Sequence, residues 1–158
     1  MLAALLTATV LGLAGLVYSA VTGFVALSSA EIFRHASFGI FFTLITLLAH
    51  SMTMFYLIGK GKAVREAATE GNLSPDFYAA VARARKPVFG IGTVAMLLTM
   101  VTAIIGAGVD TGTMPAGVHS VLAVSAIGAN VMALRTEVAA MVSSSRVVAE
   151  VDALLALQ

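Results

Sequence analysis

The stretch EIFRHASFGIFFTLITLLAHSMTMFYLIGKGK, from Glu31 to Lys62, decides the fold class. Residues 35–59 contain no Asp, Glu, Lys or Arg, and this uncharged run exceeds the roughly 20 apolar residues that cross a bilayer as a helix. Two of the three histidines of the chain, His35 and His50, lie inside it. We therefore predict a transmembrane helix that holds two titratable rings.

Three more windows of the chain carry no charge, namely residues 1–30, 87–109 and 111–134. Charged residues make up 11% of the 158 residues, against about 25% in a soluble domain. The sequence therefore predicts an all-α integral membrane protein, an antiparallel four-helix bundle. Its expected spans are about 2–28, 31–59, 87–108 and 115–141.

The first window differs from a secretory signal peptide. It has no basic n-region, and its apolar run is longer than the 7–15 residues typical of an h-region. We expect it to be a retained helix.

The basic residues are distributed asymmetrically, which predicts the orientation. With four spans, eight of the nine Lys and Arg residues fall on one side together with both termini, and Arg34 falls on the other. Short loops rich in Lys and Arg stay in the cytoplasm. We expect both termini to be cytoplasmic, in a bacterial inner membrane.

The segments outside the spans are also predicted to be helical. The second helix should continue past the membrane to Glu70, and Ser74 and Pro75 should begin a short helix that ends at residue 85, so that 60–86 forms a cytoplasmic helical hairpin. Pro87 and Pro115 should begin the third and fourth spans. The tail, 143–158, reads as a separate amphipathic helix.

All three histidines lie within predicted spans, where ionisable groups are costly and usually face the bundle interior. His35 and His119 each lie near the exterior start of a helix, so we expect them at one level. His50 lies 15 residues beyond His35, about 22 Å deeper.

Two imidazoles at one depth suit a planar tetrapyrrole, with haem b as the primary hypothesis. Gly39, one turn from His35, and Ala123 and Ala126, one and two turns from His119, would leave room beside the rings. The helix count and the intramembrane histidines are similar to those of small four-helix membrane cytochromes b, a likeness that assigns no residue roles.

Other interpretations of this pair stay open. Glu31, His35, Asp110 and His119 would together form a site for copper, zinc or iron near the exterior face. In a purely structural interpretation the rings hydrogen-bond to hydroxyls or carbonyls of neighbouring helices.

The role of His50 is a separate question. It would bind one face of a tetrapyrrole with Met96 or a partner subunit opposite, or it would hydrogen-bond to Asn130 or a threonine; we favour the hydrogen bond. Arg135 and Glu137 are expected to form an ion pair at the membrane interface.

The sequence is compatible with three functions. The first is an electron-transfer protein that binds a tetrapyrrole, as a subunit of a larger complex or a homo-oligomer in contact with the lipid bilayer and a quinone. The second is a metal-binding membrane protein, and the third is a non-catalytic structural subunit. Whether the chain is an enzyme is left open. It has no cysteine, which excludes thiolate ligands, and no nucleotide-binding loop or nucleic-acid-binding feature.

Overall fold

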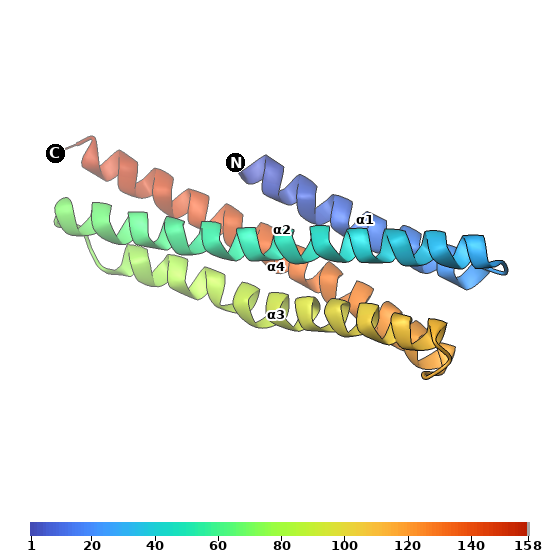
Figure 1. Cartoon of the computed structure of the whole chain (residues 1–158). Helices are drawn as coiled ribbons and strands as arrows, with labels where there is room; N and C mark the ends of the chain where they lie inside the picture. Colours follow the sequence, from blue (N-terminus) through green and yellow to red (C-terminus); the bar gives the residue numbers. More distant parts are fainter. Residues whose placement is uncertain (158) are drawn as a thin grey trace.

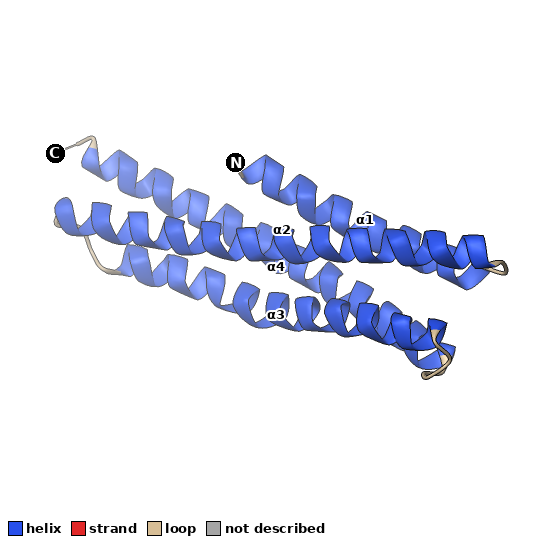
Figure 2. Ribbon diagram, in the orientation of Figure 1, coloured by secondary structure: helices blue, strands red, loops and turns tan. Residues whose placement is uncertain are grey.

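The computed structural model describes residues 1–157 and contains four helices, which the ribbon views show lying side by side (Figures 1 and 2). They are α1 (Leu2–Val25), α2 (Ser29–Glu70), α3 (Asp76–Asp110) and α4 (Ala116–Leu155). Each is long and apolar enough to cross a membrane, as predicted.

The four helices form two hairpins, α1–α2 and α3–α4, whose connections lie at the same end of the molecule (Figure 1). The first connection is fixed by a capping box, in which Glu31 N donates to Ser28 Oγ (3.4 Å) and Ser28 N donates to Glu31 Oε2 (2.9 Å). In the second, Gly112 adopts a φ of 70°, a left-handed conformation that glycine accepts without a steric penalty. Helices α2 and α3 then pack together, and α4 packs against both α1 and α2.

Helices α2, α3 and α4 extend beyond α1 at the opposite end (Figure 1). They have 42, 35 and 40 residues. At about 1.5 Å per residue they are about 50–65 Å long, whereas the hydrocarbon core of a bilayer is about 30 Å thick. A small core of Val64, Val81 and Val151 holds this three-helix extension together.

The bounds of these helices differ from the prediction in two places. Helix α3 begins at Asp76 and passes through Pro87, which was expected to begin a separate span. Helix α4 continues to Leu155, although the tail was expected to be a separate helix. In both cases buried packing on either side of the expected break keeps the helix continuous, and at Pro87 this packing overrides a strong helix-breaking residue. The predicted continuation of α2 to Glu70 is confirmed.

The side-chain distribution reverses along the long axis. Where α1 is present, the buried side chains include many polar ones, while large apolar side chains such as Phe41, Phe55 and Ile104 are exposed. In the three-helix extension the buried residues are valines and small residues such as Ala68, and charged residues such as Arg65 and Glu150 are exposed. The outer surface is therefore apolar along one part of the bundle and charged along the other.

Candidate functional site

His35 of α2 and His119 of α4 meet at the end of the bundle that carries both hairpin connections. Their ring centroids lie 6.0 Å apart, with an angle of 77° between the ring planes. The prediction that these two imidazoles share one level is therefore confirmed. Both rings are half-buried.

Each ring of this histidine pair is oriented by a backbone carbonyl of a neighbouring helix. His35 Nδ1 lies 2.8 Å from the carbonyl oxygen of Ser19 on α1, and His119 Nδ1 lies 3.1 Å from that of Thr102 on α3. A carbonyl only accepts, so each Nδ1 carries the hydrogen and donates it. In a neutral ring Nε2 is then the unprotonated nitrogen, and no group within residues 1–157 hydrogen-bonds to it in either ring.

Two glycines make room for the histidine pair. A Cβ atom added to Gly23 of α1 would lie 2.6 Å from Cε1 of His35, and one added to Gly106 of α3 would lie 2.9 Å from Cε1 of His119. Both distances are too short for a real contact, so any side chain at these positions would displace a ring. Gly39, predicted to lie beside His35, instead faces Ser19 Oγ, which would lie 3.1 Å from its added Cβ.

The two predicted alanines lie on the α4 side of the same end, where Ala126 is buried and Ala123 is half-buried. A shallow groove of about 310 Å³ runs beside them, starting at the residue that follows His119. Its lining residues are Phe24, Ser120, Val121, Val124 and Ser125. Because α1 contributes Phe24 and α4 the rest, the groove lies between these two helices.

The two carboxylates proposed as metal ligands lie in other surroundings. Glu31 Oε2 accepts hydrogen bonds from Leu27 N, Ser28 N and Ser28 Oγ, each at 2.9 Å, and so caps its own helix. Asp110 is exposed at the end of α3. Within residues 1–157, no three His, Asp or Glu side chains are close enough together to hold a metal ion.

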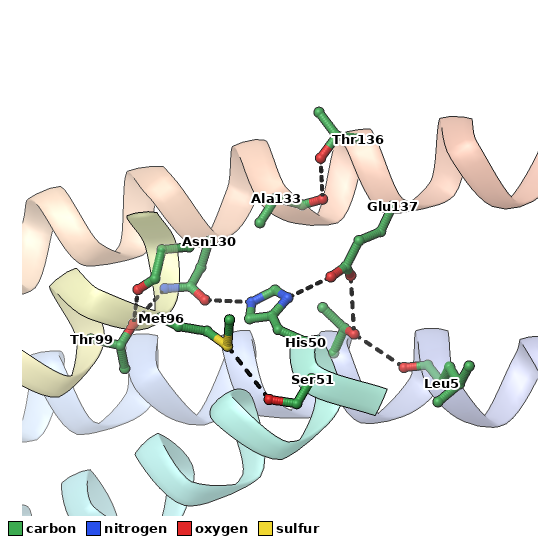
Figure 3. A network of polar contacts seen from close by, with 11 residues as sticks. Leu5, His50, Ser51, Met96, Thr99, Asn130, Ala133, Thr136 and Glu137 are labelled. Atoms are coloured by element: carbon green, nitrogen blue, oxygen red, sulfur yellow. Dashed lines mark hydrogen bonds and ion pairs between the residues drawn. The ribbon is translucent and has the colours of Figure 1, made fainter. Parts of the chain in front are cut away.

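A second polar site lies deeper in the bundle, around His50 (Figure 3). His50 Nδ1 lies 2.6 Å from Glu137 Oε1 and its Nε2 lies 2.8 Å from Asn130 Oδ1, while both the histidine and the glutamate are completely buried. Asn130 Nδ2 donates to Thr99 Oγ1 (2.8 Å) and to the Ala126 carbonyl (2.7 Å). Thr9 Oγ1 lies 3.4 Å from Glu137 Oε2, so all four helices contribute to this network.

The hydrogen bonds of Asn130 determine the proton positions on His50. Its amide nitrogen has two acceptors, so its Oδ1 faces His50 and accepts. His50 Nε2 therefore carries a hydrogen. The contact between His50 Nδ1 and Glu137 Oε1 then holds one proton between two groups, which leaves the pair without net charge.

The predicted hydrogen bond between His50 and Asn130 is confirmed. Both ring nitrogens of His50 are engaged, so neither is free for a metal. Met96, proposed to lie opposite His50 on a tetrapyrrole, accepts a hydrogen bond from Ser51 Oγ, with Sδ 3.6 Å away. The expected interfacial pair of Arg135 and Glu137 is wrong, because Glu137 is completely buried against His50.

Sequence reasoning missed several residues that position the two sites, namely Thr9, Ser19, Gly23 and Thr102. Thr102 and Ser19 act through backbone carbonyls, which no residue type encodes. Gly23 and Thr9 lie on the first helix, where no site residue was predicted.

Comparison of the chain with protein-family models, curated proteins and solved structures gives no match.

Proposed function

We propose that the chain is an integral membrane protein whose four helices cross the bilayer where α1 is present. This is supported by the reversal of the side-chain distribution, since large apolar residues belong in lipid and charged ones in water. The three-helix extension would then project into the cytoplasm. Seven of the nine Lys and Arg residues lie at that end of the bundle, as in proteins of the bacterial inner membrane, whereas Arg135 lies in the four-helix part and Arg34 at the other end.

Within this membrane protein, His35 and His119 would together hold haem b or a related tetrapyrrole, which would carry electrons. The observation that supports this is that both rings donate Nδ1 to a carbonyl and keep Nε2 available. Metal-binding histidines are commonly oriented in this way by their second nitrogen. The ring centroids lie 6.0 Å apart, so the two imidazoles are close enough together to serve one binding site.

The donor set favours a tetrapyrrole over a bare ion. Two imidazoles meet here. Within residues 1–157, no third His, Asp or Glu side chain lies close enough to bind the same metal ion. A tetrapyrrole brings four nitrogen ligands of its own and needs the protein to supply two, whereas copper, zinc or iron ions need more ligands from the chain.

Each residue at this end then has a defined role. The Ser19 and Thr102 carbonyls orient the ligand rings, and Gly23 and Gly106 give those rings space. The groove at Ser120 would leave room for part of the bound group beside His119. When bound, the tetrapyrrole supplies one-electron chemistry. The protein would act as a subunit or homo-oligomer that exchanges electrons with a membrane quinone or a partner protein.

The optical spectrum of the purified protein tests this function. We expect a Soret band that shifts on reduction, with iron at about one atom per chain. His35→Ala and His119→Ala should each lose the band, while Ser37→Ala, an exposed change two residues from His35, should keep it. A protein without a Soret band in either redox state, expressed in haem-sufficient cells, would refute the assignment.

A further inference from the structure

The deeper site contains a titratable pair that the proposed electron transfer does not use. Helices α1 and α3 present threonines, Thr9 and Thr99, to the hydrogen-bonded network, and threonines do not titrate. Asn130 is uncharged as well. Within the described part of the chain, His50 and Glu137 are therefore the titratable members of this network.

Three buried hydroxyls lie on the same helix faces as this pair, and none has a hydrogen-bond partner. Thr46 and Thr53 lie four residues before and three residues after His50 on α2, and Ser144 lies seven residues after Glu137 on α4. Their exposed fractions are 1%, 0% and 1%. An unpaired buried hydroxyl in a native protein calls for an explanation, and an exchangeable polar ligand such as water or a proton carrier is one.

The surroundings of the pair differ toward the two ends of the bundle. Toward the extension, Leu5, Leu57, Val88 and Met141 form a buried apolar cluster. Leu57 lies two turns beyond His50 and Met141 one turn beyond Glu137, so this cluster separates Ser144 from the pair.

Toward the hairpin connections, the interior of α1 and α2 carries hydroxyl groups. Thr46 is followed by Thr43, 8% exposed, and Ser19, 4% exposed. Ser19 Oγ lies 3.3 Å from the His35 carbonyl, so one of these buried hydroxyls lies at the half-buried outer end. Apolar side chains thus close the pair on one side, whereas separate buried hydroxyls lie on the other, with the Phe42 ring packed on Gly15 between Thr46 and Ser19.

We propose that His50 and Glu137 form a proton-binding site that exchanges its proton with the end of the bundle that carries His35 and His119, through the hydroxyl of Thr46. The proton between Nδ1 and Oε1 leaves along this route, the pair then carries one negative charge, and a proton from the same end restores neutrality. Only N–H and O–H bonds break and form. This site is independent of the proposed tetrapyrrole.

Proton exchange at His50 tests the proposal, and the chain provides a matched pair of variants. Protein with ¹⁵N-labelled histidine in lipid nanodiscs reports the rate at which the ring protons of His50 exchange with water. We expect Thr46→Val to slow this rate at least tenfold. Thr53→Val makes the same change to another unpaired buried hydroxyl, one turn from His50 on the closed side, and should leave the rate within twofold.

Thr46→Ser, which restores the hydroxyl, should return the rate to that of the wild type, provided that thermal melting shows all variants folded. Slowing by Thr53→Val without slowing by Thr46→Val would overturn the direction of access. Equal effects of both, or of neither, would overturn one-sided exchange altogether. The result does not depend on a bound pigment, so the two proposals fail separately.

Discussion

Breaking the pair formed by His50 and Glu137 should strongly destabilise the bundle. The two side chains have exposed fractions of 0% and their nearest atoms lie 2.6 Å apart, so water does not screen the contact. Removing one partner of such a pair costs about 3–5 kcal/mol, because the other polar group stays buried without a partner. We therefore expect Glu137→Leu and His50→Leu each to lower the free energy of unfolding by about that amount.

The double variant His50→Leu/Glu137→Leu should be less damaging than either single change. It leaves neither charge behind, and the remaining unpaired group is Asn130 Oδ1, whose burial without a donor costs about 1–3 kcal/mol. Thr9 keeps its hydrogen bond to the Leu5 carbonyl at 3.1 Å. The two single effects should therefore be far from additive.

Unfolding in detergent, followed by the loss of helical circular dichroism as sodium dodecyl sulfate is added, measures these differences. Val138→Leu, an exposed change beside Glu137, is the control and should stay within about 0.5 kcal/mol of the wild type. Two observations would refute the reasoning. One is a single Leu variant that costs less than about 1 kcal/mol, and the other is a double variant whose cost equals the sum of the two single costs.

Three further changes test other parts of the structure. Gly23→Ala should displace the His35 ring and reduce pigment content several-fold, measured by absorbance per chain, whereas Gly128→Ala, where an added Cβ meets open space, should not. Val81→Ala should lower the midpoint of thermal unfolding, because it leaves a cavity in the completely buried core of the extension that costs about 2 kcal/mol. Ser28→Ala should remove the cap of α2 and lower the free energy of unfolding by about 1 kcal/mol, which the same thermal measurement should show as a lower midpoint.

The four membrane-length helices could be predicted because their signal is local. Each uncharged window is sufficient to indicate a helix, whatever packs against it. The helix ends were predicted less well, because they depend on contacts between distant residues. Pro87 normally ends a helix, but Val81 and Val88 on either side of it are completely buried against other helices, and this packing keeps α3 continuous.

The candidate site was predicted in part for the same reason. Helix rise and connectivity put His35 and His119 at one level, and the structure has them together. Glu137 was misplaced because a sequence indicates the face of a residue more reliably than its depth. Its spacing of seven from Asn130 put both on one helix face, but the neighbouring Arg135 suggested the membrane surface. Helix α4 extends well past both residues, so Glu137 lies inside the bundle.

The two histidine sites differ in how many ring nitrogens the protein satisfies. At His50 both nitrogens are engaged by side chains, so this site is complete and can change only by gaining or losing a proton. At His35 and His119 the protein engages one nitrogen of each ring, and the two rings, from different helices, make an edge-on contact. Because an unpaired nitrogen in apolar surroundings is costly, a ligand that satisfies both rings at once would also join the two hairpins. Binding of such a ligand should therefore stabilise the bundle at the end where its two hairpin connections lie.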